Sequence, residues 1–115
     1  MRISLTARHY KAPEKLKEYA QNEVRRLKKY YDGIIECDII LDYEKKSNSI
    51  QIAEIAIKVY GQKMVAREKS EDIYKSINQA VDKLERRVIK YKEKLKNHKH
   101  EKVFVPDSPT SIEEE

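Results

Sequence analysis

Residues 71–99 carry an apolar stripe that constrains the fold more than any other segment of the chain. Apolar side chains recur there every three or four positions, at Ile73, Ile77, Val81, Leu84, Val88, Tyr91 and Leu95. This spacing places them on one face of an α-helix. Ser70 stands where an N-cap is expected, and Glu71 and Asp72 put negative charge on the first turn, which favours the helix dipole. The segment therefore predicts a long helix whose apolar face is buried.

Residues 13–31 carry a second stripe of the same kind. Its apolar positions are Leu16, Ala20, Val24, Leu27 and Tyr31. Pro13 suits the first helical position, where its missing N–H costs nothing. Gly33, which follows Asp32, is expected to end this helix in the left-handed conformation.

Four further segments, residues 2–8, 36–44, 50–60 and 63–69, alternate apolar and polar residues with the period of a strand that has one buried face. Gly61 and Gln62 predict a hairpin loop between the last two. The order β-α-β-β-β-α predicts an α+β fold, a two-layer sandwich in which two helices cover one face of a four-stranded mixed sheet. The right-handed crossover rule makes the first two strands parallel neighbours. We expect one domain over residues 1–99 and a flexible acidic tail over 100–115.

Charge is distributed unevenly along the chain. Residues 1–99 hold 24 basic and 15 acidic side chains, a net charge of +9, whereas the last 16 residues are acidic. Such a surplus favours a polyanionic partner. On the second helix a ridge of cations flanks the apolar stripe, and the last turns of the first helix are basic; the candidate RNA-binding residues are Arg25, Arg26, Lys28, Lys29, Lys83, Arg86, Arg87, Lys90 and Lys94. Arg8, at the end of the first strand, would add to one rim.

Two helices side by side would bring these cations together as a charged groove, which suits the recognition of a phosphate backbone. The structural alternative is that the same cations complement helix C-termini and keep the protein soluble. Nucleic-acid binding is favoured because both helices supply such cations.

Other functional classes find little support in the sequence. The chain has two distant glycines, which cannot form a phosphate-binding loop, and one cysteine, Cys37, which is expected in the core. His98 and His100 have a spacing that does not place them on one helix face, so we expect no metal site. No nucleophile stands with a base, and we expect no enzyme activity, cofactor or small-molecule substrate. No apolar run is long enough to span a membrane and no signal peptide is evident, which predicts a cytoplasmic protein without a membrane partner.

One segment resembles a known family. Residues 64–87, MVAREKSEDIYKSINQAVDKLERR, match the last strand and second helix of the ribosome hibernation factors, also called sigma-54 modulation proteins, with their acidic-Asp-hydrophobic-Tyr helix start and Asp-Lys-Leu-Glu-Arg core. Residues 3–30 resemble the first strand and helix of the same family. The resemblance covers about residues 1–99.

The resemblance implies binding to 16S ribosomal RNA in the decoding region of the 30S subunit, where messenger RNA and the A- and P-site transfer RNAs bind. Such a protein keeps 70S ribosomes inactive in stationary phase or stress. The positions that match the family's RNA-contacting residues are Arg26, Lys28, Lys29, Lys83, Arg86, Lys90 and Lys94, and Arg87 is an addition to them. Ala12 replaces the threonine that often caps the first helix. Longer members carry a dimerising domain that this chain lacks, and its acidic end, Glu113 to Glu115, resembles the non-dimerising type, so we expect a monomer off the ribosome.

Two other hypotheses stay open. A free double-stranded RNA-binding module can also be built from a sheet and two helices with basic rims. A regulatory protein that binds an acidic protein partner would need the same surplus of positive charge.

Overall fold

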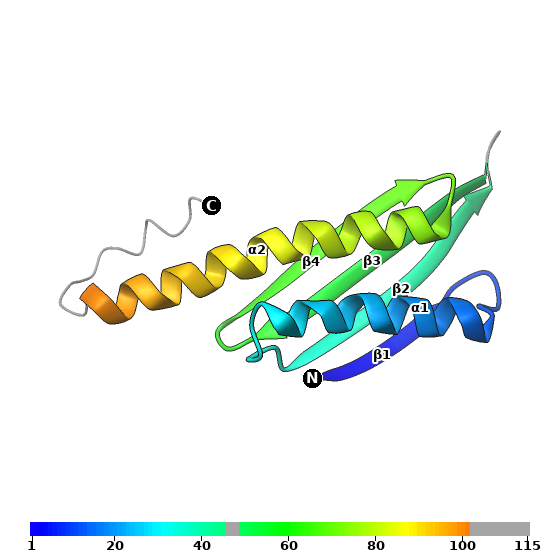
Figure 1. Cartoon of the computed structure of the whole chain (residues 1–115). Helices are drawn as coiled ribbons and strands as arrows, with labels where there is room; N and C mark the ends of the chain where they lie inside the picture. Colours follow the sequence, from blue (N-terminus) through cyan, green and yellow to red (C-terminus); the bar gives the residue numbers. More distant parts are fainter. Residues whose placement is uncertain (46–48, 102–115) are drawn as a thin grey trace.

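Two helices lie side by side on one face of a four-stranded sheet (Figure 1). The computed structural model describes residues 1–45 and 49–101, with side chains as far as Lys96. The elements follow the predicted order: β1 (Arg2–Ala7), α1 (Glu14–Arg25), the 3-10 helix η1 (Arg26–Lys29), β2 (Glu36–Lys45), β3 (Ser49–Val59), β4 (Gln62–Ser70) and α2 (Ile73–Glu101). The strands lie in the order β1-β2-β3-β4, with β1 parallel to β2 and the other pairs antiparallel. The predicted α+β architecture is confirmed.

The register of the sheet aligns the apolar side chains of all four strands. Ile3 pairs with Cys37, Cys37 with Ile57, and Ile57 with Met64, so one apolar row crosses the sheet under the helices. Cys37 is fully buried, and burial raises the pKa of its thiol to about 12, as expected of a core residue rather than a reactive one. The face away from the helices carries the other members of each alternation, which include Asp38, Glu54 and Lys69 but also Ile52 and Val65.

The apolar stripe of α2 is buried over most of its length. Ile77, Val81, Leu84 and Val88 are inaccessible to solvent, but Leu95 is 42% exposed. The prediction for Leu95 is wrong because α2 runs past the end of the sheet (Figure 1). The β3-β4 turn lies level with Tyr91, whose hydroxyl donates to the Tyr60 carbonyl at 2.8 Å.

The helix starts differ from the predicted ones. Pro13 is the N-cap of α1, with extended backbone angles, rather than its first helical residue. For α2 the capping side chain is Asp72, whose Oδ1 accepts the backbone N–H of Tyr74 at 3.1 Å. Ser70 instead ends β4, and its hydroxyl lies 2.7 Å from that of Ser76. Glu71 and Asp72 therefore precede α2 rather than form its first turn.

The end of the first helical segment also differs. The α-helix stops at Arg25 and tightens into η1, where the Leu27 carbonyl accepts the backbone N–H groups of Tyr30 and Tyr31. Gly33 does not adopt the left-handed conformation, which among the described glycines belongs to Gly61 in the β3-β4 turn. A Cβ on Gly33 would lie 2.4 Å from the Tyr31 ring, so close packing explains this glycine.

The predicted domain boundary lies near the end of α2, which continues to Glu101. Of the predicted flexible tail, residues 100–115, the part from residue 102 onward lies outside the described residues.

Candidate nucleic-acid interface

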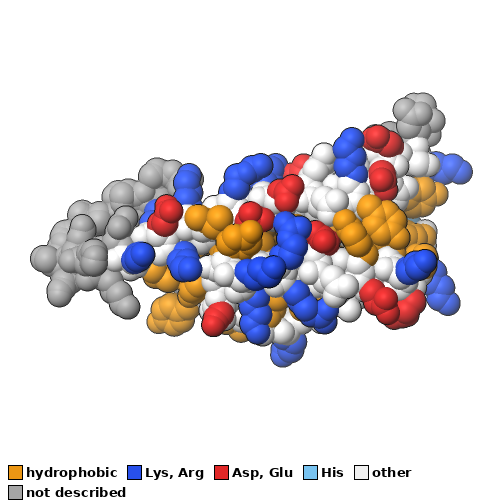
Figure 2. All heavy atoms as spheres, viewed as in Figure 1, with side chains coloured by type: hydrophobic (Ala, Val, Ile, Leu, Met, Phe, Trp, Pro, Cys, Tyr) orange, Lys and Arg blue, Asp and Glu red, His pale blue; other side chains and the backbone are white. Residues whose placement is uncertain are grey.

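All of the predicted RNA-binding cations except Arg8 belong to α1, η1 or α2. Figure 2 shows Lys and Arg side chains over the middle of the helical face and along both of its margins, with acidic side chains between them. The helical face is therefore strongly but not uniformly positive. The pairing of each cation decides which of them are available to a ligand.

The ridge of cations on α2 lies over β4. Lys83 Nζ is 2.6 Å from Glu68 Oε2, and Arg87 Nη1 donates to the Val65 carbonyl at 2.5 Å. Both partners belong to β4, so this flank of α2 faces away from α1. The expectation that the ridge helps to frame a groove between the two helices is therefore wrong.

The contact between the helices is instead closed by ion pairs. The Arg26 guanidinium lies 2.5 Å from Glu23, 3.1 Å from Glu85 and 3.5 Å from Asp82. Partial burial opposes its charge, but the carboxylates of Glu23, Glu85 and Asp82 outweigh that effect and raise the pKa of Arg26. Three carboxylates thus already neutralise this predicted RNA-binding residue.

Several of the predicted RNA-binding cations are exposed and have no acidic partner in the described part of the chain. Within residues 1–45 and 49–96, Lys28, Lys29, Arg86 and Lys90 are exposed and pair with no acidic side chain. Arg25 donates to the neutral Asn22 amide at 2.9 Å, which leaves its charge uncompensated. These residues can form charge-assisted hydrogen bonds to phosphate without first breaking an ion pair.

Arg8 lies on the other side of the sheet. Its backbone N–H donates to Leu41 at 2.8 Å, which continues the β1 ladder, and the alternation places its exposed side chain with Thr6 on the face away from the helices. Its charge helps to lower the pKa of Asp42 on the same face. The structure does not bring Arg8 to the rim where the sequence predicted it.

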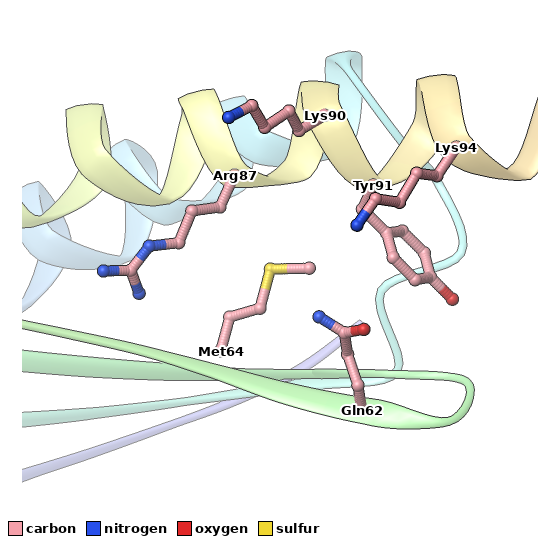
Figure 3. Close-up of a pocket in the computed structure, with 6 residues that line it drawn as sticks. All are labelled: Gln62, Met64, Arg87, Lys90, Tyr91 and Lys94. Atoms are coloured by element: carbon pink, nitrogen blue, oxygen red, sulfur yellow. The ribbon is translucent and has the colours of Figure 1, made fainter. Parts of the chain in front are cut away.

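A recess opens between α2 and β4, beyond the point where Arg87 contacts the strand. Its volume is about 340 Å³, and its lining residues are Gln62, Met64, Arg87, Lys90, Tyr91 and Lys94 (Figure 3). We refer to it as the α2-β4 recess. Gln62 and Met64 were not among the predicted site residues, because helical spacing does not reveal which flank of a helix meets which strand.

Among the described residues, no group of three or more His, Cys, Asp or Glu side chains could hold a metal ion. Over the same part of the chain, no helix is both long and apolar enough to cross a membrane.

A family model described as "Sigma 54 modulation protein / S30EA ribosomal protein" matches residues 3–96. The chain belongs to this family. The match spans all four strands and both helices almost to the end of the described side chains, so the predicted resemblance is confirmed. The predicted RNA-binding cations all lie within the matched residues.

Relatives and solved structures agree with the family assignment. The ribosome hibernation promoting factor of Azotobacter vinelandii is 31% identical over 94 residues, which cover 82% of this chain and 85% of the relative. That of Escherichia coli K12 is 29% identical over 98 residues, 85% of this chain and all of the relative. The protein Y N-terminal domain of Thermus thermophilus has a TM-score of 0.72 at 28% identity, over 79% of this chain and 99% of that domain. A ribosomal subunit interface protein of Coxiella burnetii has the same TM-score at 26% identity, over 81% and 99%. Two of these proteins are named as ribosome hibernation promoting factors and one as a ribosomal subunit interface protein.

Proposed function

We propose that this chain is a ribosome-associated translation inhibitor. It binds 16S ribosomal RNA in the decoding region of the 30S subunit, excludes messenger RNA and the A- and P-site transfer RNAs, and keeps 70S ribosomes inactive in stationary phase or stress. A protein with this role works in the cytoplasm. The observation that supports the proposal is the coincidence of the family match over residues 3–96 with unpaired cations on the helical face of the same domain.

The pairing of the cations sets their roles in this proposal. Lys28, Lys29, Arg86 and Lys90 contact phosphates directly, because no described carboxylate competes for them. Arg25 adds a further contact near the end of α1. Lys83 is held against Glu68 and Arg26 against Glu85, so these two mainly fix the helices that present the other cations. Arg87 donates one N–H to the Val65 carbonyl and keeps its other N–H groups for phosphate. Lys94 extends the positive flank of α2 toward its end.

Co-sedimentation with purified 30S and 70S particles tests the proposal. Alanine at Lys28, Lys29, Arg86 and Lys90 together should weaken binding about tenfold or more, because several phosphate contacts are lost. The matched control removes the same charge elsewhere, with alanine at the exposed Lys11, Lys58, Lys63 and Lys69. The control variant should bind almost as well as the original protein. Equal loss in both variants would mean that only net charge matters and would contradict a helical binding face.

Competition with duplex RNA separates this function from a free double-stranded RNA-binding module. A decoding-site inhibitor should stay with the 30S subunit in excess duplex RNA, whereas a general duplex-binding module should leave it. Translation of a reporter messenger RNA on purified ribosomes should fall as the protein is added. Binding without inhibition would exclude the decoding region as the site.

A further inference from the structure

The α2-β4 recess combines an apolar floor with a positive rim. Met64, which is only 5% exposed, rises from β4 toward α2, and the Tyr91 ring comes down from the helix beside it (Figure 3). Arg87, Lys90 and Lys94 line the α2 side, and Gln62 supplies an amide from the β4 side. The Lys94 ammonium turns down beside Tyr91, whereas the Lys90 ammonium lies along the upper side of the helix (Figure 3). Apolar surface and positive charge therefore meet in one site.

The walls of the recess are fixed before any ligand binds. The Tyr91 hydroxyl donates to the Tyr60 carbonyl at 2.8 Å, and its ring packs edge-on against Tyr31 with ring centroids 5.4 Å apart. The Arg87 guanidinium donates to the Val65 carbonyl, which uses one of its N–H groups and leaves others for a ligand. A preformed site of this kind loses little conformational entropy on binding.

We propose that the α2-β4 recess takes one unpaired nucleotide of RNA. Its base lies against Met64 and Tyr91, with the Gln62 amide at the base edge, and its phosphate lies among Arg87, Lys90 and Lys94. A phosphate alone would not require the apolar floor, and an apolar peptide would not require three cations. Base contact with aromatic and apolar side chains and phosphate contact with cations are the two features of single-stranded RNA recognition. The inference rests on the proposed function, because it names the form of RNA that the α2 flank receives.

The Met64 methyl group reports directly on the recess. The chain has two methionines, Met1 and Met64, so the methyl resonance of Met64 in the full-length protein can be assigned with a Met64→Leu variant. An adenosine oligonucleotide of about ten residues should shift this resonance upfield, because the base ring current acts on a methyl group that it contacts. A strand of equal length without bases, and a poly-glutamate peptide, should leave it in place.

Either control ligand producing the same shift would overturn the inference, since phosphate or carboxylate charge alone would then account for binding. No shift at a concentration that saturates binding would overturn it as well. A double substitution of Lys90 and Lys94 by alanine should weaken oligonucleotide binding and reduce its salt dependence by about 1.4, or about 0.7 for each phosphate contact on a single strand.

A blocking variant connects the recess to the ribosome. Gln62→Trp fills the opening without changing the charge, and it should weaken 30S binding about tenfold, within the range of one lost base contact. Val65→Trp is the matched control, because Val65 lies on the same strand with its side chain on the opposite face.

If Gln62→Trp and Val65→Trp both bind like the original protein, the recess takes no ribosomal nucleotide although the proposed function stands. If the original protein fails to bind ribosomes, the proposed function fails, and the Met64 shift still decides whether the recess takes RNA. If Gln62→Trp does not fold, that same shift is the deciding measurement.

Discussion

Asp42, on the sheet face away from the helices, is held in its charged form by its neighbours. His9 Nδ1 lies 2.7 Å from Asp42 Oδ1, and the backbone N–H of Tyr43 donates to the same oxygen at 2.7 Å. The His9 hydrogen bond, the Tyr43 hydrogen bond and the positive charges of His9 and Arg8 lower the pKa of Asp42. His9 itself has a φ of 68°, which is uncommon outside glycine, so this bond also holds a strained turn after β1.

Because the pKa of Asp42 is lower in the folded protein, its ionised form stabilises the fold. That contribution is complete above the pKa of an unfolded aspartate, about 3.9, and is lost as the pH falls through the lower folded value. We therefore expect Asp42→Asn to be less stable than the original protein at pH 6, and the difference to shrink at about pH 3. Urea unfolding at the two pH values measures it. A difference that is the same at both would show that the Asp42 charge does not stabilise the fold.

The identity of each cation was available from the sequence, but its pairing was not. Arg26 and Arg86 look equivalent as exposed helical arginines, yet Arg26 contacts Asp82 and Glu85, more than fifty residues away in the chain. Such pairing depends on which helix faces meet in three dimensions. The sequence therefore predicted a basic helical face, but it did not show that Arg26 and Lys83 pair with acidic side chains.

At the scale of elements, Arg26 of η1 joins the first helical segment to α2 through Asp82 and Glu85, and Tyr19 of α1 donates to Asn78 of α2. Arg26→Ala should lower the free energy of unfolding by about 0.5–1 kcal/mol, the range of partly exposed ion pairs, and should change ribosome binding little. Arg86→Ala should do the reverse, because this side chain is exposed and pairs with no acid in the described part of the chain. Chemical denaturation and co-sedimentation of both variants measure the two effects. If Arg26→Ala weakened ribosome binding as much as Arg86→Ala, Arg26 would have to leave its carboxylates and contact RNA.

Periodicity predicted the type and order of every main element, because each strand and helix buries one face. The boundaries depend on particular contacts that periodicity does not contain. Gly33 was expected to have a left-handed backbone, but the Tyr31 ring explains it, and Asp72 rather than Ser70 caps α2. Both Ser70 and Asp72 are good capping residues, so the choice between them is settled by where β4 stops pairing with β3, since Ser70 still pairs with Gln51.

At the scale of the whole molecule, the positive charge of residues 1–99 should make ribosome binding strongly salt-dependent. Each phosphate contact contributes about 0.7–0.9 to the slope of log binding constant against log salt concentration. The variant with alanine at Lys28, Lys29, Arg86 and Lys90 should therefore show a slope shallower by about 3. Binding measured across a series of potassium chloride concentrations gives this slope. An unchanged slope would mean that these four side chains do not neutralise phosphate.

The arrangement of charge over the whole molecule was the least predictable feature. Helical spacing placed Lys83 and Arg87 beside the apolar stripe of α2, but it did not show whether that flank would face α1 or β4. Asp82 and Glu85 lie on the opposite flank of α2, where they pair with Arg26. Their acidic side chains were a sequence signal for which flank faces the first helical segment. The resemblance identified the family, and the pairing in three dimensions separated the free cations from the engaged ones.

The last turns of α2 extend beyond the hairpin that ends the sheet (Figure 1), so the sheet does not cover this part of the helix. A single helix is about 10–12 Å across, whereas the protein measures 27 × 17 Å across its long axis. The molecule is thus narrow where α2 stands alone and broader where both helices cover the sheet. A crevice too narrow for the sheet and its two helices can still admit the end of α2. The broader part of the molecule then limits how far α2 enters.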